Sequence, residues 1–142
     1  MGEKEYTLLI IKPGAIKRGI AGEIISRFEK TGIKIEKIVL DSFSENVIKE
    51  LYREHKEKRF YNDLINTISE EKILVMILSG AEGIINKVRK MNGATNPVEA
   101  KPGTIRGDYG CYMGPDNVVH ASDSKEAAAR EIKLFFPDFL DD

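Results

Sequence analysis

The amino-acid sequence predicts an α/β or α+β domain in which helices cover a small sheet. Two continuous apolar runs of strand length, residues 6–11 and 73–78, alternate with segments whose apolar residues recur at helical spacing. The chain has 142 residues, which is enough to bury one core without covalent crosslinks. We therefore expect a single domain over residues 1–142.

The N-terminal elements follow from local patterns. The apolar run 6–11 ends at Lys12-Pro13-Gly14, which predicts a buried strand that stops there. Helical spacing of isoleucine and phenylalanine predicts a helix over 20–28, and Gly32 is placed as its C-cap. Alternation over 33–40 predicts a strand, and its change of phase near Glu36-Lys37 predicts a β-bulge.

Helices and strands alternate through the rest of the chain. Helical spacing predicts helices over 47–52, 60–68 and 84–91, and the run 73–78 predicts a second buried strand. Residues 92–116 are rich in Gly, Pro and Asn and show no periodicity, which predicts a long loop of the kind that is usually functional.

A short strand over 118–120 and a final helix complete the order β-α-β-α-α-β-α-loop-β-α. This order fits a parallel doubly wound sheet and a split β-α-β antiparallel sheet equally well.

Composition limits the classes of function. With 22 basic and 23 acidic residues the net charge is -1, which predicts no general attraction to nucleic acid or to an anionic membrane. The single cysteine, Cys111, excludes an internal disulfide, and no Cys/His spacing suggests zinc. The apolar run 6–11 is too short for a signal peptide, and no segment approaches a membrane span. We expect a cytoplasmic protein.

A histidine and a glutamate near the C-terminus form a candidate nucleophilic site. His120 ends the last strand, and Glu131 lies on the inward stripe of the following helix. If the helix folds back beside the strand, the carboxylate can accept a hydrogen bond from one imidazole nitrogen and leave the other nucleophilic. A core histidine satisfied by a core glutamate is the alternative interpretation.

Three cations at the ends of predicted elements form a candidate phosphate site. Lys12, Arg89 and Arg106, if they converge on His120, would offset the charge of a transferring phosphoryl group. The sequence holds neither a P-loop nor a dinucleotide fingerprint. For each cation alone, a solvated surface position is the usual outcome.

Two further residues have a default structural interpretation. His55 is flanked by charged residues at a helix end and is expected to be solvated. Phe60 begins a helix and by default belongs to the core, but an exposed Phe60 would offer a face on which a base can stack.

Several separated motifs, in order along the chain, resemble the nucleoside diphosphate kinase family. Asn117-Val-Val-His120-Ala-Ser-Asp-Ser is similar to that family's N-x-x-H-G-S-D-S, and Lys12-Pro13 with Arg18-Gly19 is similar to its K-P-D-G-x-x-R-G. Gly93-Ala-Thr-Asn-Pro97 and Lys101-Pro-Gly-Thr-Ile-Arg-Gly-Asp108 match its central loop closely.

The resemblance implies the ferredoxin-like α/β sandwich, with a four-stranded antiparallel sheet covered by helices. It implies that His120 carries the phosphate in a ping-pong reaction and that Glu131 and Ser122 orient or support it. It also implies phosphate and sugar contacts or base stacking for a larger set: Lys12, Tyr52, Phe60, Leu64, Arg89, Thr95, Arg106 and Asn117.

The implied reaction moves the γ-phosphate of an NTP, mainly ATP, to an NDP. Mg²⁺ would be held mainly through the nucleotide phosphates rather than by protein ligands. Because stacking reads few base edges, broad base and sugar specificity is expected. The expected partners are NTP and NDP nucleotides and further copies of the chain in a hexamer or tetramer, with no membrane or nucleic acid.

The chain departs from the family pattern at a few positions. Gly14 stands where the family usually has Asp, and Ala121 replaces a glycine, which would cost about 1 kcal/mol if that position needs a positive φ. The segment 109–116 is one residue longer than usual, and Pro115-Asp116 lies where a basic residue is common.

These departures keep a second hypothesis open, a catalytically silent nucleotide-binding regulatory protein of the same fold. A third, a nucleic-acid-binding protein that uses the sheet, is disfavoured by the near-zero net charge.

Overall fold

The structure, a computed structural model, describes residues 3–111, 114 and 116–141. Four strands form one antiparallel sheet in the order β2-β3-β1-β4. Their bounds are β1 Lys4–Ile11, β2 Lys34–Asp41, β3 Ile73–Ala81 and β4 Val119–Ala121. The antiparallel alternative is therefore the correct one, and the expected ferredoxin-like architecture is confirmed.

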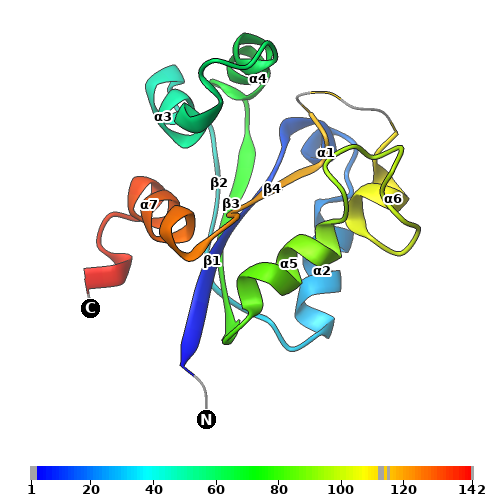
Figure 1. The fold of residues 1–142 in the computed structure, drawn as a ribbon, viewed down its shortest axis with the longest axis vertical. Helices are drawn as coiled ribbons and strands as arrows, with labels where there is room; N and C mark the ends of the chain where they lie inside the picture. The colour runs from blue at the N-terminus through cyan, green and yellow to red at the C-terminus, as the bar shows by residue number, and fades with distance from the viewer. Residues whose placement is uncertain (1–2, 112–113, 115, 142) are drawn as a thin grey trace.

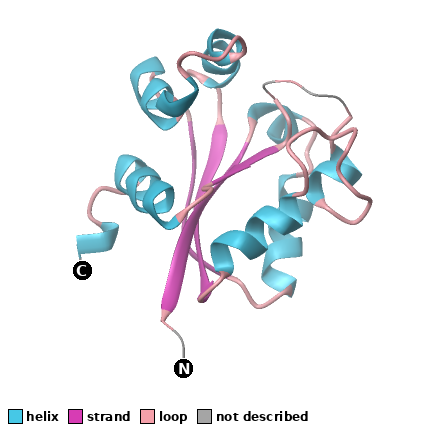
Figure 2. Cartoon of the chain, viewed as in Figure 1, coloured by secondary structure: helices cyan, strands magenta, loops and turns pink. Residues whose placement is uncertain are grey.

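Helices cover both faces of this sheet, as Figures 1 and 2 show. In Figure 1, α2, α5 and α6 lie to one side of the strands and α3 and α7 to the other. The α-helices are α1 Pro13–Lys17, α2 Ala21–Lys30, α3 Glu45–Leu51, α4 Tyr61–Ile68, α5 Ile84–Asn92, α6 Ile105–Tyr109 and α7 Lys125–Phe135. Two 3-10 helices, η1 Arg53–His55 and η2 Phe139–Asp141, complete the described elements.

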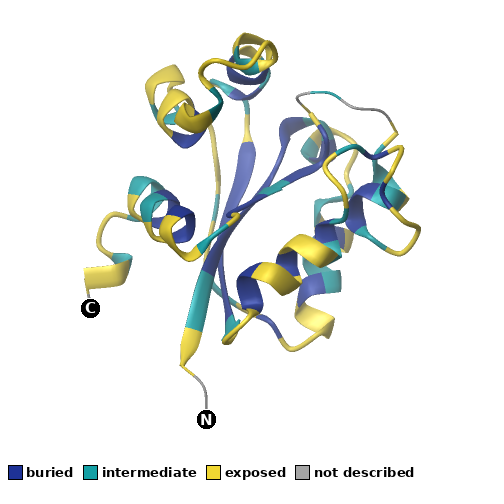
Figure 3. Cartoon of the chain, in the orientation of Figure 1, coloured by how far each residue is buried: buried dark blue, intermediate teal, exposed yellow. Residues whose placement is uncertain are grey.

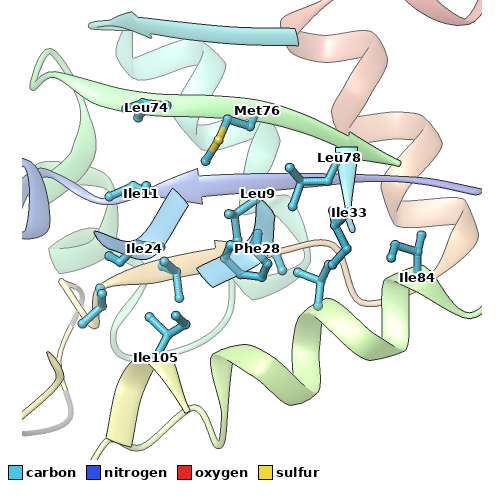
Figure 4. Close-up of a cluster of buried hydrophobic side chains, with 14 of the residues drawn as sticks. Leu9, Ile11, Ile24, Phe28, Ile33, Leu74, Met76, Leu78, Ile84 and Ile105 are labelled. Carbon is cyan, nitrogen blue, oxygen red and sulfur yellow. The ribbon is translucent and has the colours of Figure 1, made fainter. Parts of the chain in front are cut away.

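Strand β1 runs through the centre and contributes to two cores, because successive side chains of a strand point to opposite faces. Leu9 and Ile11 pack with Ile24 and Phe28 of α2, as Figure 4 shows. Leu8 and Ile10 belong to the other core, which includes residues of α3, α4 and α7. The dark blue central strands in Figure 3 reflect this burial on both faces. Strand β4 pairs with this buried central strand.

The bulge predicted in β2 is present. The register of β2 against β3 shifts between Ile35 and Lys37, which leaves Glu36 as the extra residue. The Glu36 carboxylate accepts a hydrogen bond from Ser79 Oγ at 2.5 Å and pairs with the Lys4 ammonium at 2.9 Å. These two contacts fix the bulged residue on β3 and β1.

Two short helices were missed because five residues are too few to show an apolar period. Helix α1 begins at Pro13, whose fixed φ suits the first turn of a helix. Helix α6 lies inside the region predicted to be loop, and Thr104 caps it by accepting a hydrogen bond from the Gly107 amide at 3.0 Å. Within the described ranges, no helix has the length and apolar character that crossing a bilayer requires.

Candidate active site

The candidate nucleophile is held at a sheet edge by a strained turn. His120 pairs with Ile10 of β1, and Val118, just before β4, has a φ of 77°. The Val119 amide donates to the Asn117 carbonyl at 3.0 Å, which closes a three-residue turn around Val118. A positive φ is rare for a β-branched residue and costs on the order of 1–3 kcal/mol. Strain of this kind is typical of functional sites.

His120 contacts Glu131 as the spacing predicted. The imidazole Nε2 lies 2.9 Å from Glu131 Oε1, and Ser122 Oγ donates to the same oxygen at 2.8 Å. Ser122 Oγ also accepts from the Leu8 amide at 3.4 Å, which ties the cluster to β1. The guanidinium of Arg130 lies 3.8 Å from the second carboxylate oxygen. Glu131 is only 4% exposed, and the contacts above give each oxygen of this buried carboxylate a compensating partner.

This geometry assigns the ring tautomer. A carboxylate only accepts hydrogen bonds, so in the neutral ring Nε2 carries the proton and Nδ1 keeps its lone pair. The edge of the imidazole meets the ring of Tyr52, with centroids 5.4 Å apart and planes at 77°. The side chain is 18% exposed and lines the main cavity. An oriented imidazole with a free nitrogen lone pair is suited to nucleophilic attack.

Lys12 is buried at the end of β1 and faces the same cavity. Its ammonium donates to Asn117 Oδ1 at 2.6 Å and lies 6.0 Å from the centroid of the Tyr52 ring. Burial, and then the Arg106 charge, lower the pKa of Lys12 from 10.5 to about 7. An anionic ligand would reverse part of this effect, because opposite charge favours the ammonium form.

Arg106 combines a structural role with an available charge. Its Nε donates to the Asn117 carbonyl at 3.1 Å, Nη1 to the Gly93 carbonyl at 3.0 Å and Nη2 to the Val119 carbonyl at 2.6 Å. Burial and the nearby Arg89 lower the pKa of Arg106 to about 10, so the guanidinium stays charged near neutral pH. Three of the five N–H donors of the guanidinium thus hold the backbone.

Arg89 and Thr95 complete the polar wall. Arg89, on α5, is exposed and its Nη1 donates to the Ala121 carbonyl at 3.4 Å. Thr95 is also exposed, and its carbonyl accepts from Asn117 Nδ2 at 3.0 Å. The buried Asn117 therefore connects Lys12 to the segment that follows α5.

The opposite wall is aromatic and apolar. Phe60 is 41% exposed, whereas Leu64, one turn further along the chain, is buried. His55 lies between Tyr52 and Phe60, with ring centroids 6.2 and 5.5 Å away. The expectation that His55 is solvated holds only in part: the residue is partly exposed, but its Nδ1 is buried and finds no partner in the described part of the chain. Burial raises the pKa of the Tyr52 hydroxyl, which therefore stays protonated.

These walls enclose a cavity of about 560 Å³, a size typical of small-molecule sites. The cavity is lined by ten of the predicted site residues: Lys12, Tyr52, Phe60, Leu64, Arg89, Thr95, Arg106, Asn117, His120 and Glu131. Ser122 is the exception and lies fully buried behind Glu131. The structure thus brings together side chains from seven separate stretches of sequence, and their roles remain predictions.

The cavity also includes residues that sequence reasoning did not select. His55 could have been found because it lies three residues after Tyr52, one helical turn away. Asp63 and Asp123 add carboxylates, and only the position of Asp123 beside the histidine motif gave a signal. Among the described residues, no three His, Cys, Asp or Glu side chains are grouped as a metal site.

The departures from the family pattern have different structural outcomes. Ala121 lies in β4 opposite Leu9 and is not among the described residues with positive φ. The backbone strain that a positive φ would impose on the alanine is therefore absent. Gly14 lies in α1 beside Asp116. Residues 112, 113 and 115 of the longer segment lie outside the described residues.

Comparisons with known proteins show the family to which the chain belongs. A family model described as nucleoside diphosphate kinase matches residues 5–140. The nucleoside diphosphate kinase of Methanocaldococcus jannaschii is 50% identical over 133 residues, which cover 94% of each chain. That of Pyrococcus horikoshii is 51% identical over 138 residues, covering 96% of this chain and 87% of the relative.

Solved structures are similar over the same range. A halophilic nucleoside diphosphate kinase from Halobacterium salinarum, in complex with CDP, has a TM-score of 0.90 and 37% identity, covering 96% of this chain and 90% of its own. A transition-state mimic of the Borrelia burgdorferi enzyme, with vanadate and ADP, has a TM-score of 0.88 and 34% identity, covering 94% and 87%. The chain therefore belongs to the nucleoside diphosphate kinase family.

Proposed function

We propose that the protein transfers the γ-phosphoryl group of an NTP, mainly ATP, to an NDP through a phosphohistidine on His120. One observation carries this proposal: Nε2 of His120 is hydrogen-bonded to a buried carboxylate, in a cavity that Lys12, Arg89 and Arg106 also line. A neutral, oriented imidazole beside positive charge is what attack on a polyphosphate requires.

The reaction has two balanced halves. His120 Nδ1 attacks the γ-phosphorus, a N–P bond forms, and the bond from phosphorus to the β-phosphate oxygen breaks, so that its electron pair leaves with the NDP. The ring becomes cationic, and Glu131 offsets that charge through Nε2–H. A second NDP then attacks the phosphorus through a β-phosphate oxygen, and the electrons of the N–P bond return to Nδ1.

The buried and the exposed cations stabilise the transferring phosphoryl group in different ways. Lys12 and Arg106 are buried and already positioned by hydrogen bonds, so they need little reorganisation when charge develops. Arg89 and Thr95 are exposed at the mouth, where they meet the phosphates of an entering nucleotide. Tyr52 fixes the imidazole from the side by its ring contact. Asn117 supports Lys12 and contacts the sugar hydroxyls.

The donor set fits a role for Mg²⁺ held mainly through the nucleotide. Magnesium in phosphate-transfer sites is usually bound by one or two carboxylates together with substrate phosphates. Asp123 is exposed in the cavity wall and is the carboxylate we assign to this role. When bound, Mg²⁺ would neutralise phosphate charge.

The base binds against Phe60, with Leu64 beneath it. Half-exposed aromatic rings offer a stacking face that every base can use, because stacking does not read hydrogen-bonding edges. Purine and pyrimidine nucleotides, with ribose or deoxyribose, are therefore accepted at similar rates. A preference of about 10³-fold for one base, equal to about 4 kcal/mol, would contradict the stacking account.

We also infer a single domain that works as a homo-oligomer, hexamer or tetramer, in the cytoplasm, with nucleotides as its partners and neither membrane nor nucleic acid. Ile38 and Leu40, half-exposed on the edge strand β2, support association between copies. Light scattering coupled to size exclusion tests the assembly.

The decisive experiment measures the transfer of a labelled γ-phosphate from ATP to the protein and then to an NDP. Incubation with γ-labelled ATP gives an acid-labile, base-stable phosphoprotein that loses its label on adding GDP, and the purified enzyme converts dTDP to dTTP. A His120→Ala variant does neither. A folded wild-type protein that binds nucleotide but takes up no label would instead be the silent regulatory protein.

A further inference from the structure

Two charged residues of the family-like motifs lie outside the cavity. Arg18 belongs to the first motif and Asp108 ends the central one, and neither is among the described residues that line the cavity. Both take part instead in the contacts that join α6, the short helix that carries Arg106, to the N-terminal helices. The way α6 is held therefore bears on the phosphate site.

Helix α6 has only five residues, Ile105–Tyr109. A helix this short is not stable by itself in water, because its nucleation costs more free energy than its few hydrogen bonds recover. Its placement therefore depends on tertiary contacts. One of them is apolar: Ile105 is buried in the same core as Ile24 and Phe28 of α2 (Figure 4).

Arg27 of α2 makes the central polar contacts to α6. Its Nη2 pairs with Asp108 Oδ2 at 2.7 Å, and its guanidinium lies 4.8 Å from the centroid of the Tyr109 ring. Its Nη1 also donates to the Gly103 carbonyl at 3.4 Å. Asp108 Oδ1 in turn accepts from the Gly103 amide at 2.9 Å. Arg27 and Asp108 thus join α2, α6 and the segment just before α6.

Two more contacts hold the last residue of α6. The Tyr109 hydroxyl donates to Glu23 Oε2 of α2 at 2.8 Å, and the Tyr109 carbonyl accepts from Arg18 Nη1 at 2.6 Å. A cation at the C-terminal end of a helix also interacts favourably with the exposed carbonyls there. We call Arg18, Glu23, Arg27, Asp108 and Tyr109 together the α6 clamp.

Arg106 connects the same helix to the active site. Its guanidinium lines the cavity and donates to the carbonyls of Gly93, Asn117 and Val119. The end of the side chain is thus bonded to the site, whereas its backbone belongs to the helix that the α6 clamp holds. A shift of α6 relative to β4 would lengthen these hydrogen bonds or turn the guanidinium away from the cavity. A donor that must already be oriented when charge develops depends on such support.

We propose that Arg27 is a positioning residue, which through the α6 clamp fixes Arg106 at the phosphate site. The clamp residues act through Arg106 rather than on the substrate. The inference rests on the proposed role of Arg106 in stabilising the transferring phosphoryl group.

The primary test measures the position of Arg106 and needs no activity. In protein with ¹⁵N-labelled arginine, NMR gives the rate at which the Arg106 Nε–H exchanges with solvent, and the signal is assigned from Arg106→Lys. In the wild type this group donates to the Asn117 carbonyl, so its exchange reports local opening. Arg27→Met should raise the rate by about 3- to 30-fold, the combined effect of a partly exposed ion pair and a cation–π contact.

Two further variants complete this test. Lys30→Met removes an exposed cation from the same helix α2 and should leave the exchange rate unchanged. Tyr109→Phe removes only the hydroxyl that is bonded to Glu23 and should raise the rate by about 2- to 10-fold, which keeps the test available if Arg27→Met does not fold. An exchange rate in Arg27→Met equal to that of the wild type, or an equal rise in Lys30→Met, would overturn the inference.

A kinetic cycle separates positioning from a merely structural role. At saturating γ-labelled ATP, Arg27→Met should slow phosphoenzyme formation by about 3- to 30-fold, less than the roughly 100-fold that a 1 Å displacement in an active site can cost. In an Arg106→Lys background the same substitution should change the rate by less than about twofold, because the positioned group is already gone. Equal losses in both backgrounds would contradict the proposal. Thermal unfolding of each variant establishes that it is folded at the assay temperature.

The two proposals fail in different ways. If the wild-type protein takes up no phosphate label, the proposed function fails, and the exchange rate of Arg106 Nε–H still decides whether the α6 clamp positions this side chain. If the label is taken up normally and Arg27→Met leaves the exchange unchanged, the function stands and the positioning role is refuted.

Discussion

The carboxylate of Glu131 offers the sharpest test of how His120 is activated. Glu131→Gln keeps the size and shape of the side chain but removes its charge. In the wild type, one oxygen of Glu131 accepts from His120 Nε2 at 2.9 Å and from Ser122 Oγ at 2.8 Å. An amide oxygen can still accept these bonds, so the substitution isolates the charge from the geometry.

The expected loss follows from the strength of the bond to the imidazole. Hydrogen bonds to charged groups contribute about 1.5–3 kcal/mol, and neutral ones about 0.5–1.5. The difference of about 1–2 kcal/mol is felt when the ring becomes cationic, because Glu131 is buried and its charge is not screened by solvent. We therefore expect phosphohistidine formation to slow by about 5- to 30-fold.

The assay is a single turnover with γ-labelled ATP, quenched at millisecond times, at saturating nucleotide. Ser122→Ala is the matched control, since it removes one hydrogen bond to the same oxygen but leaves the charge. It should slow the step less than Glu131→Gln does. Formation of the phosphoenzyme by Glu131→Gln within twofold of the wild-type rate would refute the charge-based account.

Further outcomes follow from other positions. The kcat/KM of the wild type should decrease as pH rises through about 7, because the free enzyme loses the Lys12 proton there, and a pH profile with Lys12→Gln as reference checks this. A limb that persists in Lys12→Gln would exclude that assignment. Phe60→Ala should raise KM about 5- to 10-fold for ATP, GTP and CTP alike, the lower end of a stacking contribution; a loss confined to purines would contradict stacking. Ala121→Gly should lower the free energy of unfolding by about 0.5–1 kcal/mol in urea titrations, because Ala121 is in an extended strand. A gain in stability would show that the alanine is strained.

The long elements could be predicted from the sequence because their patterns extend over enough residues. The runs that became β1 and β3 are buried on both faces, and the change of phase in β2 marked the bulge at Glu36. Strand direction could not be predicted, because the apolar pattern of a fully buried strand does not depend on its neighbours. Helices α1 and α6 could not be predicted because each has only five residues, too few to show a helical period of apolar residues.

In the candidate site, too, contacts set by local spacing could be predicted and contacts set by tertiary folding could not. The pair His120 and Glu131 could be placed by helical spacing, since both lie on neighbouring elements. The convergence of Lys12 with Arg106 depends on tertiary folding, so their positions at the ends of predicted elements could only suggest it, and the resemblance to a family supported it. His55 was misjudged in part because its charged neighbours in sequence give no sign that its ring meets Tyr52 and Phe60.

The way β4 is held has a consequence for inactivation. This strand has three residues and, among the described strands, pairs with β1 alone. The Arg106 guanidinium donates hydrogen bonds to the carbonyls of Val119 in the strand and of Asn117 just before it. Local detachment of such a short edge strand needs much less free energy than global unfolding. It would displace His120 and, at the same time, remove the hydrogen bonds that position Arg106. Heated enzyme should therefore lose turnover before it loses its helices. Bound nucleotide, by engaging Arg106, should slow amide hydrogen exchange in this strand first.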